Sequence, residues 1–206
     1  MTNTSVFSVR MNDPSINLIP QDGELFFDEH FLSHQESKRL FTYIEKNLDW
    51  QEETIRMFGR PCKVPRLVCW YGEPDARYRY SGTMHVPNPW NKELLRLKTH
   101  IEQAMGAGFN SVLGNLYRNE TDSMGWHSDN EKELGTNPVI ASLSLGETRR
   151  FSLRHKARKK TFHLDLPSGS LVMMKGSLQA NWKHALLKET RPCLPRINLT
   201  FRNVCR

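Results

Sequence analysis

Apolar positions in this 206-residue chain follow one spacing before Phe109 and another after it. Before Phe109, two segments place apolar residues three or four positions apart, which is typical of a helix with one buried face. The first follows a Ser33–Glu36 capping-box pattern, and the second covers residues 92–105 and stops at Gly106. The predicted buried stripes are Leu40, Phe41, Ile44 and Leu48, then Leu94, Leu97, Ile101 and Met105.

After Phe109, apolar and polar residues alternate in short segments that are separated by turn residues. Successive side chains of a strand point to opposite faces, so each of these segments would have one apolar face. The clearest apolar faces are Val139, Ala141, Leu143 and Leu145, then Ile197, Leu199 and Phe201. Repeated short strands of this kind predict an antiparallel sandwich or barrel, and the fold class is therefore α+β.

Composition and charge narrow the class of protein. Residues 1–24 are polar and contain Pro14 and Pro20, which indicates an N-terminal extension ahead of one domain at 25–206. No apolar run approaches the roughly 20 residues of a membrane helix, and the four cysteines form no CxxC pair. We therefore expect a cytoplasmic protein (nuclear if eukaryotic) that acts as a monomer. The net charge of +7 favours an anionic partner such as nucleic acid.

The stretch "GWHSDNE" at 125–131 is a candidate metal site. His127 and Asp129 would point to the same side of a strand, and a two-histidine, one-carboxylate triad needs a further histidine. His184, just ahead of the last strand, is the best candidate. His155 lies among arginines and lysines that would repel a cation, and His163 fits a surface position. An isolated HxD pair also arises by chance, so its residues alone leave a structural role open.

The last strand, "RINLTFR", carries a polar face opposite its apolar one. That face consists of Arg196, Asn198, Thr200 and Arg202. If it lines a barrel interior, its arginines are buried and need an anion, for which a small dicarboxylate is suited. A solvated edge strand is the alternative. Upstream, Asn115 and Tyr117 form a second polar pair on one strand face.

Several motifs occur together and in order between about Val64 and Arg202: "NLYRNETDSMGWHSDNE", "PVIASLSLG", "GSLVMM", "WKH" and "PRINLTFR". This region closely resembles the AlkB-type iron(II)/2-oxoglutarate dioxygenases, which repair alkylated DNA. The resemblance implies a double-stranded β-helix (jelly-roll) core at about 109–206, with the N-terminal helices packed on one sheet. Nucleotide-recognition elements would occupy about 54–90.

The same resemblance implies roles for the candidate residues. His127, Asp129 and His184 would be the catalytic Fe(II) ligands. The far carboxylate of 2-oxoglutarate would pair with Arg202 or, if the two arginines exchange roles, with Arg196. Assisting contacts would come from Asn115, Tyr117, Asn198 and Thr200. With O2, the enzyme would oxidise the N-methyl group of bases such as 1-methyladenine and 3-methylcytosine, releasing succinate, CO2 and formaldehyde.

Substrate contacts also follow from the resemblance. Tyr78 and Tyr80 would hold a flipped base, with the ring of His127 on its other face, and Asn130 and Glu131 would contact it. The hairpin "RMFGRPCKVPR" resembles that of members acting on double-stranded DNA. Its predicted contacts are Phe58 as an inserted finger, Gly59 at the turn, and Arg60 and Arg66 on phosphates. A core position for Phe58 is the alternative.

The basic run "RRFSLRHKARKK" at 149–160 is a solvated loop or, in a nucleic-acid enzyme, a phosphate contact on a hairpin. Two other functions remain open: a demethylase of RNA or single strands, and a binding module without turnover. The complete set of metal and arginine residues argues against the binding module.

Overall fold

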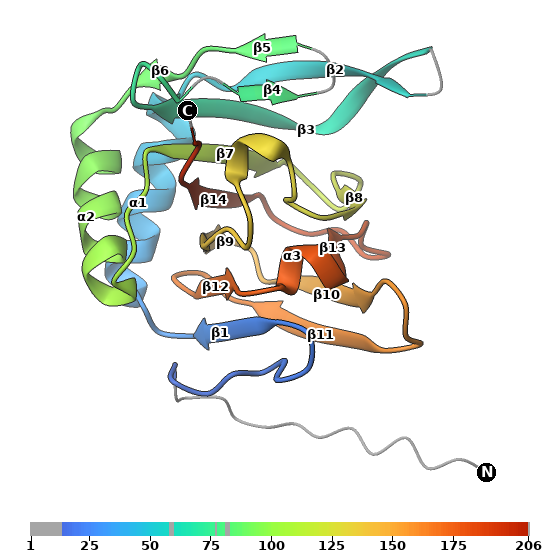
Figure 1. Ribbon diagram of the computed structural model, residues 1–206. Helices are drawn as coiled ribbons and strands as arrows, with labels where there is room; N and C mark the ends of the chain where they lie inside the picture. The colour runs from blue at the N-terminus through green and yellow to red at the C-terminus, as the bar shows by residue number, and fades with distance from the viewer. Residues whose placement is uncertain (1–13, 58–59, 77, 81–82, 206) are drawn as a thin grey trace.

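The computed structural model describes residues 14–57, 60–76, 78–80 and 83–205 (Figure 1). Two largely antiparallel sheets face each other, and two helices cover the outer side of the larger sheet. The helices are α1 (His34–Asn47) and α2 (Lys92–Met105), with a short α3 (Leu178–Asn181) and a 3-10 turn at Lys132–Leu134. The α+β class predicted from the hydrophobic pattern is confirmed.

The larger sheet has the strand order β1-β12-β9-β14-β7-β3-β2, with β6 paired to β3. Its strands are β1 (Glu24–Asp28), β2 (Gln51–Met57), β3 (Arg60–Gly72), β6 (Asn88–Pro89), β7 (Ser111–Tyr117), β9 (Ile140–Gly146), β12 (Leu171–Lys175) and β14 (Arg196–Arg202). The last strand of the chain thus lies in the middle of the sheet, between β9 and β7. A central position excludes the solvated edge-strand interpretation of "RINLTFR".

The smaller sheet has the order β11-β10-β13-β8. Its strands are β8 (Met124–His127), β10 (Arg149–His155), β11 (Thr161–Leu166) and β13 (Trp182–Leu186). A separate hairpin of β4 (Tyr78–Tyr80) and β5 (Thr83–His85) lies beside β2 and β3 in Figure 1.

Local sequence signals set the ends of both long helices. The Ser33 side chain accepts a hydrogen bond from the Glu36 backbone N–H, and the Asn91 side chain accepts one from that of Leu94. Gly106 ends α2 with a φ of 62°, a left-handed conformation that glycine adopts without steric cost. The predicted limits are confirmed, except that α1 ends at Asn47, one residue before Leu48.

The helices bury their apolar stripes on the larger sheet. Leu40, Ile44, Leu94 and Ile101 are fully buried and belong to one core cluster. From the sheet this cluster includes Ala141, Leu143, Leu145, Ile197, Leu199 and Phe201. Each such leucine or isoleucine contributes about 1.5–3 kcal/mol of burial free energy, so this face anchors the sheet that carries the site.

A second apolar cluster closes one end of the space between the sheets. It includes Leu25, Ile140, Leu153 and Val172, and also Ile19 from the predicted N-terminal extension. The other end, between β14 and β7 on one side and β8 and β13 on the other, contains a cavity that polar and apolar residues line together. No helix in the described part of the chain is both long and apolar enough to span a membrane.

Candidate metal centre and adjoining pocket

Strand pairing brings the predicted metal residues together. His127 on β8 lies directly opposite His184 on β13, and their rings meet edge to face at 4.2 Å between centroids. Asp129 follows β8 by two residues, and its Oδ1 lies 3.6 Å from His127 Nε2. One ligand atom from each of the three residues lies within 4.8 Å of the others, which fits a single ion.

The other two candidate histidines lie elsewhere. The His155 ring contacts Asp22 at 3.3 Å and packs edge-on against Trp182. His163 is exposed, as expected, and contacts the Ser152 hydroxyl. The cross-strand register thus identifies His184, among the later histidines, as the third metal residue. This register could not be predicted from the sequence alone.

Neighbouring groups orient the metal residues. The Gly125 carbonyl lies 2.8 Å from His127 Nδ1 and accepts its proton, which leaves the Nε2 lone pair for a metal ion. Gln179 on α3 accepts a hydrogen bond from the Asp129 backbone N–H at 2.9 Å. Arg202 Nη2 donates to Asp129 Oδ2 at 2.8 Å, leaving the other carboxylate oxygen beside His127.

The electrostatics of the buried site favour a bound cation. Burial alone would raise the pKa of Asp129, but Arg202, His184 and His127 together lower it to about 2. Burial and, to a smaller extent, the neighbouring His127 lower the pKa of His184 to about 3. Near neutral pH the site therefore combines a carboxylate with unprotonated imidazole nitrogen, the states in which these side chains bind metal. Two imidazoles and one carboxylate form the facial set that suits iron(II).

The polar face of β14 points into the space between the sheets, and all four of its residues are buried. Asn198 donates to the Ser142 hydroxyl at 2.7 Å and accepts from Thr200 at 2.9 Å. Arg196 Nη2 donates to Ser144 Oγ at 2.8 Å. Side chains of β9 and β14 therefore satisfy each other and hold the polar face in a fixed arrangement.

Arg196 differs from Arg202 in its partners. It is 2% exposed, its Nε has no hydrogen-bond partner, and it forms no ion pair with any carboxylate of a described residue. Burial lowers the pKa of Arg196 to about 10, which reflects the cost of a cation without an anion. Arg202 is paired with Asp129, whereas Arg196 pairs with no carboxylate of the described residues and can therefore take an acidic ligand.

A narrow cavity connects Arg196 with the metal residues. Asn115 lies in this cavity, and its Oδ1 accepts a hydrogen bond from Arg66 Nε at 2.7 Å. The guanidinium group of Arg196 lies over the Tyr117 ring at 5.5 Å. The predicted cofactor-binding residues all line this cavity: Asn115, Tyr117, Arg196, Asn198, Thr200 and Arg202.

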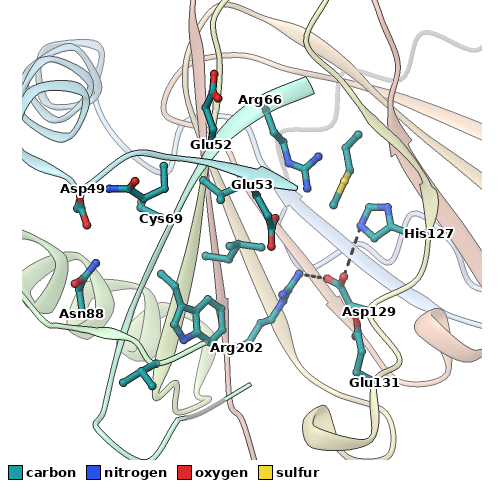
Figure 2. Close-up of a pocket in the computed structure, with 16 residues that line it drawn as sticks. Asp49, Glu52, Glu53, Arg66, Cys69, Asn88, His127, Asp129, Glu131 and Arg202 are labelled. Atoms are coloured by element: carbon teal, nitrogen blue, oxygen red, sulfur yellow. Dashed lines mark hydrogen bonds and ion pairs between the residues drawn. The ribbon is translucent and has the colours of Figure 1, made fainter. Parts of the chain in front are cut away.

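A larger pocket of about 340 Å³ opens on the other side of His127 and Asp129 (Figure 2). Its apolar lining comes from Val68, Trp70, Val86, Leu113 and Met124, and its acidic lining from Asp49, Glu52, Glu53, Asp129 and Glu131. The Oε2 atom of Glu131 is buried and has no hydrogen-bond partner among the described residues. This pocket can admit a planar organic group as far as the metal residues, with carboxylates around it.

The predicted substrate residues are not all gathered at the pocket. Glu131 lines it, whereas Asn130 and Arg60 are exposed and do not. Phe58 and Gly59 lie outside the described residues. The backbone of Tyr78 and Tyr80 forms β4, and their side chains lie outside the described part of the structure.

Two expectations about basic residues need correction. Arg66 is 4% exposed and donates to Asn115, so it is directed into the pocket and away from a surface phosphate. Arg149 is buried, where it donates to the carbonyls of Asp122 and Leu187 and pairs with Glu189. Both residues therefore have partners within the fold, Arg66 in the cavity and Arg149 among core carbonyls.

Other parts of the basic run also have intramolecular partners. Arg150 pairs with Asp165, and Arg158 pairs with Asp22. Lys156 donates to two backbone carbonyls of α3, at Gln179 and Ala180. Arg154 lies over the Trp126 ring at 4.6 Å. Several residues of the run therefore have partners within the fold, while Arg150, Arg154, Arg158, Lys159 and Lys160 remain exposed, and a phosphate contact of this hairpin stays a prediction.

Several residues of the site were not predicted from the sequence. Ser142 and Ser144 alternate with the apolar face of β9, so the alternation itself could have identified them as inward-facing. Gln179 and Trp70 gave no sequence signal, because their roles depend on contacts with residues far away in the chain.

Comparisons with known proteins agree with this geometry. The family model described as "2OG-Fe(II) oxygenase superfamily" matches residues 25–202. A solved structure of OsALKBH1 superposes with a TM-score of 0.64 at 17% identity, covering 87% of this chain and 96% of that one. The chain belongs to the 2OG-Fe(II) oxygenase superfamily, in its AlkB-type group, and the predicted jelly-roll fold is confirmed. Iron(II), 2-oxoglutarate and O2 are the cofactor and cosubstrates consistent with its site.

The curated relatives are AlkB homologues. The alpha-ketoglutarate-dependent dioxygenase alkB homolog 3 of Bos taurus is 42% identical, covering 84% of this chain and 64% of that protein. The DNA oxidative demethylase ALKBH2 of Homo sapiens is 34% identical, covering 82% of this chain and 69% of that protein. The chain thus spans a little less than two thirds of the length of the alkB homolog 3 proteins it matches.

Proposed function

We propose that this protein removes alkyl groups oxidatively from DNA bases such as 1-methyladenine and 3-methylcytosine. The reaction would use Fe(II), 2-oxoglutarate and O2 and release succinate, CO2 and formaldehyde. One observation carries the proposal: a base-sized pocket with an acidic lining opens directly onto the His127–Asp129–His184 site. The DNA activity named for ALKBH2 supports the choice of substrate.

The chain's own residues divide into cofactor and substrate sides. His127, Asp129 and His184 would hold the iron, which supplies oxidising power when bound. Arg196, with unused donor capacity, would pair with the far carboxylate of 2-oxoglutarate, assisted by Asn198. Arg202 would instead hold Asp129 in place, because its Nη2 already donates to that carboxylate. This division assigns the two arginines of one strand face to different partners.

On the substrate side, the pocket walls would orient the base and exclude water. Trp70, Leu113 and Met124 provide apolar surface beside the His127 ring. The buried Oε2 of Glu131 offers an acceptor for the exocyclic amine of adenine or cytosine. A base inside a stacked duplex cannot reach such a pocket, so the base must be flipped out.

The direct test is to incubate the iron-loaded protein with single- and double-stranded oligonucleotides that carry one methylated base. Demethylation and succinate should appear together and in equal amounts. Succinate without demethylation of any oligonucleotide would contradict the nucleic-acid substrate while leaving the dioxygenase class intact. An RNA oligonucleotide with the same lesion tests the alternative, an RNA demethylase.

Duplex preference depends on the hairpin between β2 and β3. The sequence of that hairpin suggests Phe58 as a wedge that would replace a flipped base, since unstacking costs about a few kcal/mol per step. Phe58→Ala should then lose activity on duplex DNA and retain most of it on single strands. Equal losses on both substrates, with a lower melting temperature, would show that Phe58 is part of the core.

A further inference from the structure

The short helix α3 is connected to two of the three metal residues. The side chain of Gln179 on this helix is buried and accepts a hydrogen bond from the Asp129 backbone N–H at 2.9 Å. Asp129 lies beyond the end of β8 at His127, so this N–H is outside the strand ladder. At its other end, α3 runs directly into β13, whose third residue is His184 (Figure 1). The position of α3 therefore affects both Asp129 and His184.

This helix is too short to be stable without contacts from elsewhere in the fold. It has four residues, whereas an isolated helix needs roughly 12–15 residues in water. The last carbonyl groups of any helix also lack N–H partners within the helix. One external contact is between backbones, because the Lys156 N–H donates to the Asn181 carbonyl at 2.8 Å. Another is from the Asn181 side chain to the Asp22 carbonyl at 3.3 Å.

The side chain of Lys156 provides two further contacts at the same end of the helix. Its ammonium group donates to the carbonyls of Gln179 and Ala180, each at 2.8 Å. A cation in this place satisfies unpaired carbonyls and interacts favourably with the helix dipole. Burial and, to a smaller extent, Lys183 lower the pKa of Lys156, which fits an ammonium group partly removed from solvent. Lys156 directly follows β10, so these bonds connect the β10–β11 hairpin to α3.

The hydrogen bonds form one connected path from the hairpin to the metal site. Lys156 holds the main chain of Gln179, and the side chain of Gln179 holds the main chain of Asp129. Because both bonds involve the same residue, a displacement of the Gln179 main chain also displaces the oxygen that holds Asp129. Metal ligands depend on supporting contacts of this kind for their orientation.

We propose that Lys156 is a positioning residue for the metal site, which holds α3 so that Gln179 fixes the Asp129 backbone beside His127 and His184. This role differs from the phosphate contact predicted for the basic run that contains Lys156. It concerns the metal residues alone and therefore does not depend on the proposed nucleic-acid substrate.

The sign of the effect on metal affinity separates positioning from charge. Lys156→Met approximately keeps the length of the side chain and removes its ammonium group. Loss of a positive charge alone would strengthen the binding of a cation, because like charges repel. Loss of positioning should instead weaken binding of Mn(II), used in place of Fe(II), at least about threefold. This is less than the roughly 10–100-fold typical of a group bonded directly to a ligand residue. Lys156→Arg, which keeps donors for the two carbonyls, should restore most of the affinity.

Two measurements on the metal-free protein test the proposal without turnover. Calorimetric titration with Mn(II) gives the affinity of the site. Hydrogen exchange of the Asp129 amide reports whether its bond to Gln179 is intact, because an amide exchanges when its hydrogen bond opens. Exchange should be faster in Lys156→Met than in the wild type and in Lys156→Arg. Lys159→Met is the control in the same hairpin, since Lys159 is exposed, and both quantities should match the wild type.

Unchanged or tighter Mn(II) binding by Lys156→Met would overturn the proposal. Equal weakening by Lys159→Met would indicate a general effect of hairpin charge and would overturn it as well. Weaker binding of a methylated oligonucleotide by Lys156→Met, with unchanged Mn(II) affinity, would make Lys156 a phosphate contact instead. If Lys156→Met fails to fold, Lys156→Gln takes its place, and wild-type Mn(II) affinity of that variant would contradict the positioning role.

Discussion

The two faces of β14, in the middle of the larger sheet, are equally buried and chemically opposite. Along β14, Ile197, Leu199 and Phe201 face the helices, while the alternating positions face the smaller sheet, and all seven residues are buried. Against the helices the sheet is apolar and closely packed. Toward the smaller sheet it presents two arginines, an asparagine and a threonine. Burial by itself therefore does not distinguish the core face from the site face. The two faces are distinguished by the elements that cover them: helices cover the apolar face, and the smaller sheet covers the polar face.

The two faces also differ in how their buried groups are stabilised. On the helix side, free energy comes from removing apolar surface from water. On the inner side, the polar groups bond to one another, as in the Ser142–Asn198–Thr200 chain, or retain donor capacity, as Arg196 does. Substitutions on the outer face should thus change stability, and substitutions on the inner face should change turnover or ligand affinity.

The largest expected effect is loss of a metal ligand. His127→Ala, Asp129→Ala and His184→Ala should each abolish turnover, because two remaining ligands hold Fe(II) poorly against water. Asp129→Ala should also lower the free energy of unfolding by about 3–5 kcal/mol, since it leaves Arg202 buried without its partner. Succinate release, bound iron and denaturant unfolding measure these effects.

Asp165→Ala is the matched control for losing a carboxylate, because Asp165 is exposed and pairs with Arg150 on the surface. It should retain both turnover and stability. Near wild-type turnover in any of the three ligand variants, with iron still bound, would contradict the metal assignment.

Leu199→Ala tests the outer face. Leu199 is fully buried in the helix-facing cluster, so the substitution should lower the free energy of unfolding by about 2–5 kcal/mol. The KM for 2-oxoglutarate of the folded protein should stay the same. Leu187→Ala, at a position that is 45% exposed, should change neither quantity. A large rise in KM with little loss of stability would contradict the division between the faces.

Arg196→Met tests the inner face of the same strand. Loss of the guanidinium should raise the KM for 2-oxoglutarate at least about 30-fold, since breaking a buried charge pair costs about 2–5 kcal/mol. Stability without ligand should be unchanged or higher, because an unpaired buried cation is removed. Thermal unfolding with and without 2-oxoglutarate separates the two effects. A larger KM effect from Arg202→Met would reverse the roles assigned to the arginines.

Gln179→Ala should have a moderate effect on the metal site. Gln179 accepts a hydrogen bond from the Asp129 backbone, and loss of such a supporting contact typically lowers metal affinity about 10–100-fold. Asn181→Ala is the control on the same helix, because Asn181 bonds to Asp22 and Ser177 and not to Asp129. Iron affinity that is equal in the two variants would count against a positioning role for Gln179.

The smallest effect should come from the exposed ion pairs between α1 and α2. Hydrogen bonds from Arg39 and Arg96 lower the pKa of Glu36 from 4.5 to about 2. The resulting stability is present above about pH 4.5 and is lost as the pH falls through about 2. Since these side chains are partly solvated, Glu36→Gln should cost less than about 1 kcal/mol at pH 7. The difference between wild type and variant should vanish in acid, and a difference that persists at low pH would contradict this origin.

The sequence by itself determined the elements and the chemical types of the site. Helical spacing with the Ser33 and Gly106 signals located α1 and α2, because caps and apolar stripes are local properties. Strict alternation in "RINLTFR" separated four polar from three apolar positions, because the side-chain period of a strand is two. The HxD pair and its motif context likewise indicated the metal residues.

Only the tertiary structure decided which of these residues meet. Cross-strand register placed His184 opposite His127, and the central position of β14 turned a polar face inward. Contacts between distant segments assigned Arg202 to Asp129, Arg66 to Asn115 and Arg149 to core carbonyls. The register of β2 against β3 shifts between Glu52 and Thr54, and Glu53 at this shift borders the larger pocket. Residue types and spacings are local, but a charge acquires its partner only when strands far apart in the chain are brought side by side.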